Sequence, residues 1–152
     1  IVIFKILNAR GMIDKIRRTI KELSDTVQEQ ATTFGASARE RSFEMIEEWL
    51  RIFPKLEMYK LEITSFSLGV AISPSLEVEL VGKHEDFSQE RLQQILTENK
   101  GSTGITLVFN TIKTAYSLHR KTYAALNDPL IVKIKVKISP EVQVFIGEPL
   151  IQ

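Results

Sequence analysis

The two histidines of the chain, His84 and His119, are the first candidates for acid–base or metal chemistry. His84 lies in the polar connection Lys83–Asp86, where three potential ligands are adjacent in sequence. Adjacent side chains seldom converge on one ion without a dedicated loop, which argues against a metal site there. His119 follows Tyr116 on the apolar side of a predicted helix, a position typical of a partly buried, hydrogen-bonded histidine. We therefore expect neither histidine to be a metal ligand or a catalytic residue.

Carboxylates and nucleophiles give no stronger indication of an enzyme. Glu40, Glu44, Glu47 and Glu48 resemble half of a metal–carboxylate helix bundle, but such sites also need a Glu-x-x-His pair, and the sequence has none. A solvent-exposed helix face explains these glutamates better. The chain has no cysteine, no Gly-x-Ser-x-Gly elbow, no phosphate-binding loop and no dinucleotide fingerprint. We therefore expect no catalytic residue, no metal and no cofactor.

One short motif suggests a ligand. Lys100-Gly101-Ser102-Thr103-Gly104 joins two predicted helices. Two predicted strands come before these helices and another strand follows them. In sequence order this gives a helix, two strands, two helices and a strand.

That order resembles the prokaryotic type of KH domain. In that family, a Gly-x-x-Gly loop between two helices clamps about four single-stranded nucleotides. The resemblance implies that Gly101 and Gly104 let phosphates approach, that Lys100 supplies charge and that the following helix offers amide donors. The chain departs from the family pattern: the usual Ile-Gly before the second variable pair is missing, the helix after the loop is longer, and the first helix and last hairpin have no counterpart.

The charge distribution is consistent with an anionic ligand or with assembly. Residues 104–138 hold six basic side chains against one acidic one, whereas residues 75–99 hold six acidic against two basic. Such polarity favours head-to-tail or pseudo-symmetric assembly as readily as ligand binding. The candidate anion or nucleic-acid contacts are Lys100, Gly101, Gly104, Lys113, Arg120, Lys121, Lys133, Lys135 and Lys137.

These residues must be positioned by helices and by two similar hairpins. Val70–Pro74 and the alternating apolar residues to Gly82 are echoed by Val136–Pro140 and the residues to Gly147. Each copy predicts a β-hairpin with a Ser-Pro turn. In the first copy, the alternation of apolar and polar residues shifts by one position near Thr64, which predicts a bulge there. With the two prolines aligned, Ile46 corresponds to Ile112. We therefore predict half-repeats at 12–82 and 87–147, of possible duplicated origin.

The lysines of the last hairpin and the glutamates of the first give two alternatives. If strand 76–80 pairs with strand 131–138, within one chain or across a dimer, the lysine row of Lys133, Lys135 and Lys137 faces the glutamate row of Glu77 and Glu79. Otherwise both rows face water and protect sheet edges from unwanted pairing.

Four helices are predicted beside these hairpins. The first, from Met12 to Phe34, has an apolar seam at three–four spacing. The second ends at Pro54, the third is capped by Asp86 or Ser88, and the fourth carries a broad apolar stripe as far as Leu126. The seam is a candidate assembly surface, formed by Ile13, Ile16, Ile20, Leu23 and Val27.

The composition is that of an ordinary globular domain. The 152 residues are 43% hydrophobic and 26% charged, with a net charge of +1, so any nucleic-acid affinity must come from a local patch. A start at Ile1, within an apolar run, suggests excision from a longer chain. The run is either a short strand or helix start in the core or, if apolar residues precede Ile1 in the parent chain, the end of a membrane helix with Arg10 among its flanking basic residues.

We expect one α+β domain over 1–152, in which two helical-hairpin plus β-hairpin units pack helices on a mainly antiparallel sheet. For function we expect a non-catalytic interaction or assembly module of a larger intracellular protein or complex, binding a protein partner or itself as a homo-oligomer, and cytoplasmic. The alternatives are single-stranded nucleic-acid binding through the Gly101–Gly104 loop, and a membrane-proximal cytosolic domain whose only membrane contact lies outside this chain.

Overall fold

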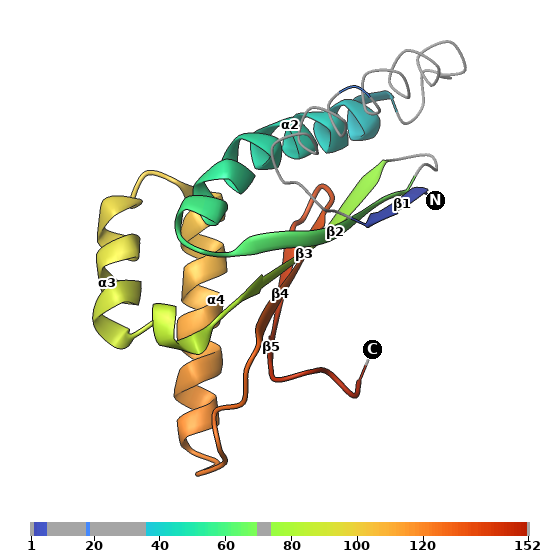
Figure 1. Ribbon diagram of the computed structural model, residues 1–152. Helices are drawn as coiled ribbons and strands as arrows, with labels where there is room; N and C mark the ends of the chain where they lie inside the picture. The colour runs from blue at the N-terminus through green and yellow to red at the C-terminus, as the bar shows by residue number, and fades with distance from the viewer. Residues whose placement is uncertain (1, 6–17, 19–35, 70–73, 152) are drawn as a thin grey trace.

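The computed structural model describes residues 2–5, 18, 36–69 and 74–151 (Figure 1). All strands pair antiparallel in the order β1-β2-β3-β4-β5. The predicted α+β class, with helices packed on a mainly antiparallel sheet, is confirmed. Along the chain the elements are β1 (Val2–Lys5), α2 (Ala36–Met58), β2 (Glu62–Gly69), β3 (Ser75–Gly82), the short 3-10 turn η1 (His84–Asp86), α3 (Gln89–Glu98), α4 (Thr103–Arg120), β4 (Leu130–Val136) and β5 (Glu141–Ile146).

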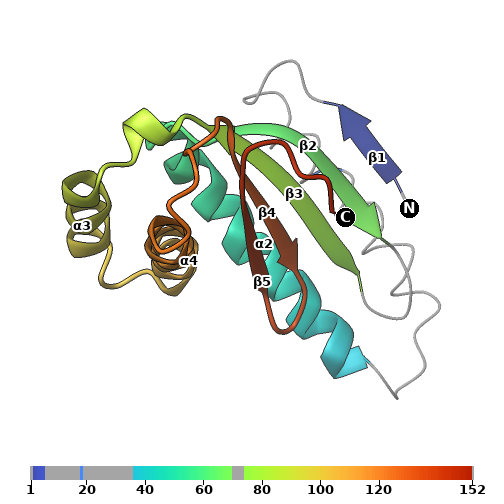
Figure 2. The ribbon, with the colours of Figure 1, turned by 90° about the horizontal axis from the view of Figure 1, so that it is seen from below.

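The described helices gather on one side of the sheet (Figures 1 and 2). α2 runs across the sheet and contacts β2, β3 and β4, whereas α4 lies beside β5 and α3 packs on α4. The segment after β5 leaves on the side opposite α4 (Figure 1). The core lies between the helices and the strand residues that face them.

Helix α2 buries one of its sides in the core. Ile46, Leu50 and Phe53 are fully buried beside Trp49, and the four predicted glutamates are exposed. The prediction that Pro54 ends this helix is wrong, because α2 continues to Met58. Pro54 lies on the solvent-exposed side of α2. The helical hydrogen bond that proline cannot donate is therefore absent on the solvent side, away from the core. Leu56, in the turn after Pro54, is buried, and its burial stabilises this last turn of α2 by about 1.5–3 kcal/mol.

Helices α3 and α4 begin at serine caps. Ser88 Oγ accepts from the Arg91 amide and Ser102 Oγ from the Ile105 amide. The predicted extension of α4 to Leu126 is wrong: the helix ends at Arg120, and Tyr123 is 96% exposed with a φ of 57°. The Thr122 hydroxyl donates to the His119 carbonyl and accepts from the Ala124 amide, which replaces the next helical turn by a local one.

The register of the sheet decides between the two arrangements predicted for the charged rows. Glu77 pairs with Lys135 and Glu79 with Lys133 across β3 and β4. The cross-strand prediction is confirmed, and the edge alternative is wrong because both strands are interior. The predicted bulge is also confirmed, as the β2–β3 register shifts between Ile63 and Ser65.

The two proposed half-repeats are described to different extents. The second has the expected order α3, α4, β4, β5, and the first is described for α2, β2 and β3. Ile46 and Ile112, which correspond in the repeat, are both fully buried. The duplication itself stays a prediction.

Two predicted features lie outside the described residues. They are the Ser-Pro turn of the first hairpin at 70–73 and the assembly seam of Ile13, Ile16, Ile20, Leu23 and Val27. Among the helices described, none combines the length and apolar character needed to cross a membrane.

Candidate functional site at the open sheet face and the β5 edge

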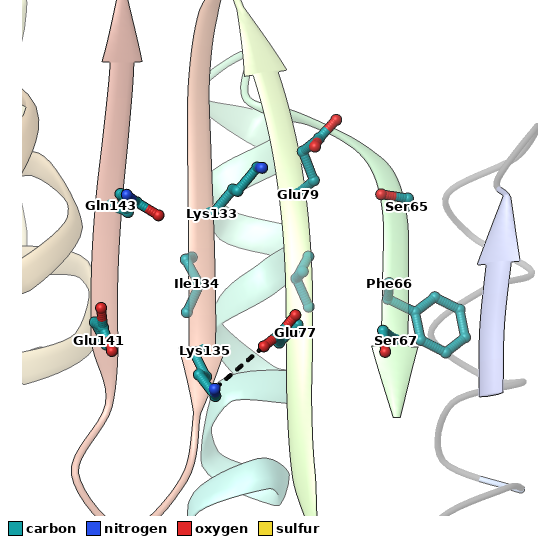
Figure 3. Close-up of a pocket in the computed structure, with 11 residues that line it drawn as sticks. Ser65, Phe66, Ser67, Glu77, Glu79, Lys133, Ile134, Lys135, Glu141 and Gln143 are labelled. Atoms are coloured by element: carbon teal, nitrogen blue, oxygen red, sulfur yellow. Dashed lines mark ion pairs between the residues drawn. The ribbon is translucent and has the colours of Figure 1, made fainter. Parts of the chain in front are cut away.

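The face of the sheet turned away from the helices, here called the open face, holds a shallow hollow of about 330 Å³. Figure 3 shows its side chains in columns, one per strand, with serines on β2, glutamates on β3 and lysines on β4. These columns follow from the period of two in each strand, because the alternate residues fill the core. The open face consists of Ser65, Ser67, Glu77, Glu79, Lys133, Lys135, Glu141 and Gln143.

Charged groups on the open face interact with one another. Lys135 Nζ lies 3.4 Å from Glu77 Oε1, as the dashed line in Figure 3 shows. Lys133 Nζ lies 5.1 Å from the centre of the Phe145 ring, a cation–π distance. The Glu79 carboxylate accepts from the Thr64 hydroxyl at 3.0 Å. The open face therefore presents pairs of opposite charge and no uniform field for an anion.

The residues predicted to contact an anion do not form one patch. Lys133 and Lys135 lie on the open face. Lys137 Nζ lies 3.9 Å from Glu141 Oε2. Lys113 and Arg120 belong to α4, on the other side of the sheet. Lys100 precedes α4 and Lys121 follows it, about 30 Å apart at 1.5 Å per residue. Nucleic-acid binding stays a prediction without a continuous basic surface.

The two glycines of the Gly-x-x-Gly loop differ. Gly101 is exposed, and a Cβ there would meet open space. Gly104 is buried, and a Cβ there would overlap Ile52 and lie 3.5 Å from Trp49. Gly104 therefore lets α4 approach α2 closely, which explains this glycine by packing.

His84 is buried, contrary to its polar sequence surroundings. Its Nε2 lies 2.6 Å from the Asn127 carbonyl oxygen, so Nε2 carries a proton and donates. In the neutral ring, Nδ1 accepts from the Tyr116 hydroxyl at 2.8 Å. The Asp128 carboxylate accepts from the His84 backbone amide at 3.0 Å. The histidine thus joins the end of β3 to α4 and to the loop before β4.

Burial, and to a lesser extent the negative charge of Asp128, raises the pKa of Tyr116 well above its usual value. The hydroxyl therefore remains a proton donor to His84 at ordinary pH. Sequence analysis had placed Tyr116 on the buried stripe but had not paired it with His84. His119, the other histidine, is only half-buried. No group of three potential metal ligands occurs within the described ranges.

The outer edge of β5 has no partner strand among the described residues. The Gly147 amide donates to the Pro129 carbonyl, next to the Leu130–Ile146 pair, so Gly147 is a hydrogen-bonded position. By alternation, the peptide groups of Phe145 and Gln143 point toward β4, whereas those of Val142, Val144 and Ile146 point outward. Among the described strands, β5 pairs with β4 only.

A groove of about 570 Å³ lies beside this edge. Its wall is Val144 of β5 and its floor is one side of α4, made of small and apolar side chains. Leu118, at one end, is 58% exposed, a large value for leucine beside a groove. The groove is formed by Thr106, Leu107, Thr111, Ala115, Leu118 and Val144, among others.

This groove was not predicted from the sequence, because only the buried stripe of α4 follows a regular apolar pattern. One signal was available: β5 has neither lysine nor proline within it, whereas β4 has two lysines. Comparisons with protein-family models, with curated proteins and with solved structures each gave no significant match to this chain.

Proposed function

We propose that the chain is a protein-interaction module whose docking site is the groove between β5 and α4. The ligand is an extended polypeptide segment that adds a strand to the sheet. The observation that carries the proposal is the outward row of peptide groups at Val142, Val144 and Ile146, which lies beside an apolar groove.

Strand addition needs two features. Unpaired N–H and C=O groups along an edge supply affinity for any extended backbone, and pockets for alternate side chains supply selectivity. β5 supplies the first feature over Glu141–Ile146, and the groove supplies the second along Leu107, Thr111 and Leu118. A segment with apolar residues at alternate positions fits both.

Sequence features at β5 agree with this role. Exposed edge strands commonly carry lysine, proline or a bulge, which prevent pairing with other chains. The residues Glu141–Ile146 include no lysine or proline, and the β4–β5 register is unbroken. Pro140 and Pro149 flank the strand, so they limit the length of any added strand to about that of β5.

Selection of random dodecapeptides on phage against the immobilised chain tests the proposal. We expect the enriched peptides to alternate apolar and polar residues. When titrated into ¹⁵N-labelled protein, they should shift the amides of Val142, Val144 and Ile146. Leu118→Asp should weaken binding about tenfold, which corresponds to about 1.4 kcal/mol.

Leu126→Asp is the matched control, because Leu126 is similarly exposed but lies in the loop beyond α4. It should leave binding unchanged. Peptides that perturb another surface, or that bind equally well to the Leu118→Asp variant, would contradict the proposal.

A further inference from the structure

We infer that the strand received at the β5–α4 groove is β5 of a second copy of this chain. The inference rests on the proposed function, since it names the occupant of the same groove. Two β5 strands related by a two-fold axis pair antiparallel, and each then fills the free edge of the other. The result is a continuous sheet with twice the five strands that are described in one copy.

The alternation of peptide groups restricts the register. An outward group must meet an outward group, which allows a register in which Val142 of one copy pairs with Val144 of the other. The axis then passes beside Gln143, which meets its own counterpart as a non-hydrogen-bonded pair. In this register Glu141 lies opposite Phe145 of the second copy.

Charge favours this register. The ammonium of Lys133 lies 5.1 Å from the centre of the Phe145 ring, on the open face. Glu141 of the second copy would thus lie beside this ammonium, and the two-fold axis repeats the interaction. Within its own chain, Glu141 Oε2 lies 3.9 Å from Lys137 Nζ, and the Glu141 side chain remains largely exposed. Its carboxylate is therefore accessible to a second lysine.

The groove face of α4 is compatible with the same axis. Val144 lies beside α4, and the groove runs from Thr103 to Leu118, so its middle is near Asn110 and Thr111. A two-fold near Gln143 places the two α4 helices antiparallel, with Leu107 of each toward Thr114 of the other. Threonine and alanine side chains on this face permit close helix packing.

A single-cysteine crosslink tests the inference on the full chain, which has no cysteine of its own. Non-hydrogen-bonded antiparallel pairs have Cα atoms about 4.5 Å apart, within the range that a disulfide spans. Gln143→Cys should therefore oxidise to a covalent dimer. The matched control is Gln93→Cys, an equally exposed glutamine replaced on α3.

We expect Gln143→Cys to crosslink at least about tenfold faster than Gln93→Cys, and light scattering of the unaltered protein to give twice the chain mass. Glu141→Lys should weaken the dimer, and adding Lys133→Glu should restore it. Equal crosslinking rates together with a monomer mass would overturn the inference. Faster crosslinking of Val144→Cys than of Gln143→Cys would overturn the register.

The two proposals fail differently. If selected peptides bind the groove of a chain that remains monomeric, the self-pairing inference fails and the proposed function stands. If neither peptides nor a second copy occupies the groove, both fail.

Discussion

The open face of the sheet and the β5–α4 edge lie side by side but differ in what they leave unsatisfied. On the open face, Lys135 is paired with Glu77, and Lys133 lies over Phe145. At the edge, the peptide groups of Val142, Val144 and Ile146 have no partner strand in the described part of the chain, and Leu118 is exposed. On the more charged surface, these two lysines thus already have partners within the chain.

The difference shows why a count of charges is a poor guide to a binding surface. Opposite charges on neighbouring strands neutralise each other and contribute modestly to stability. Backbone groups at a free edge have no such internal partner. Changes to the Glu77–Lys135 pair should therefore alter stability, and changes at the edge should alter association.

Proline substitution in β5 should give the largest effect on association. Val144→Pro removes an outward N–H while leaving the β4–β5 hydrogen bonds in place. We expect loss of strand addition by about a hundredfold, which corresponds to about 2.7 kcal/mol, measured by light scattering over a dilution series.

Gln143→Pro is the informative counterpart, because its N–H points toward β4. It should lower the melting temperature more than Val144→Pro does. If the two prolines were equivalent in both assays, the assignment of inward and outward peptide groups would be wrong.

The glycines before α4 separate packing from ligand contact. Gly104→Val should lower the free energy of unfolding by about 1–3 kcal/mol, because the new methyl groups overlap Ile52. Gly101→Val, in open space, should stay within about 0.5 kcal/mol of the unaltered protein. Urea denaturation measures both, and a neutral Gly104→Val would remove the packing explanation.

Tyr116 should make stability depend on pH in the alkaline range. Its raised pKa means that the folded state holds the phenolic proton more tightly than the unfolded chain. The associated stability is complete below the unfolded pKa of about 10 and is lost as the pH rises above it.

Tyr116→Phe leaves His84 Nδ1 without its donor, so we expect a loss of about 1–3 kcal/mol at neutral pH. We also expect a flatter decline of stability above pH of about 10. Tyr123→Phe, at a 96% exposed position, is the control and should change neither. An unchanged alkaline profile in Tyr116→Phe would show that the buried hydroxyl is not its source.

Charge exchange on the open face should give the smallest effect. Glu77→Lys alone should cost about 0.2–1 kcal/mol, and combining it with Lys135→Glu should recover most of this. Neither change should alter the oligomeric state in light scattering. Dispersal of the dimer by Glu77→Lys would show that the open face is itself an interface.

Local patterns in the sequence were enough to predict much of the sheet. The period of two placed Glu77 and Glu79 on one face of β3 and the lysines on one face of β4, because the other face of each strand had to be buried. The register that sets Glu77 opposite Lys135 was one of two alternatives, and the structure decides it. The cap of α3 at Ser88 was likewise one of the two that nearby residues indicated, with Asp86 as the other.

Most errors arose where distant contacts override local preference, and one, the early end of α4, arose from a hydrogen bond between near neighbours. Pro54 lies within α2 because Leu56 is buried against the sheet, and α4 ends early because Thr122 bonds to His119. His84 is buried by Tyr116 and Asn127, which are more than 30 residues away. The β5–α4 groove depends on how α4 lies against the sheet edge, which no local pattern determines.

Hydrogen exchange of the β5 amides tests the central claim most directly. In a dilute monomer, the Val144 amide should exchange quickly while the Gln143 amide, bonded to β4, is protected. At high protein concentration or with a selected peptide, Val142, Val144 and Ile146 should become protected together. Rapid exchange at these three positions under every condition, or full protection already in the dilute monomer, would contradict a free edge that receives a strand.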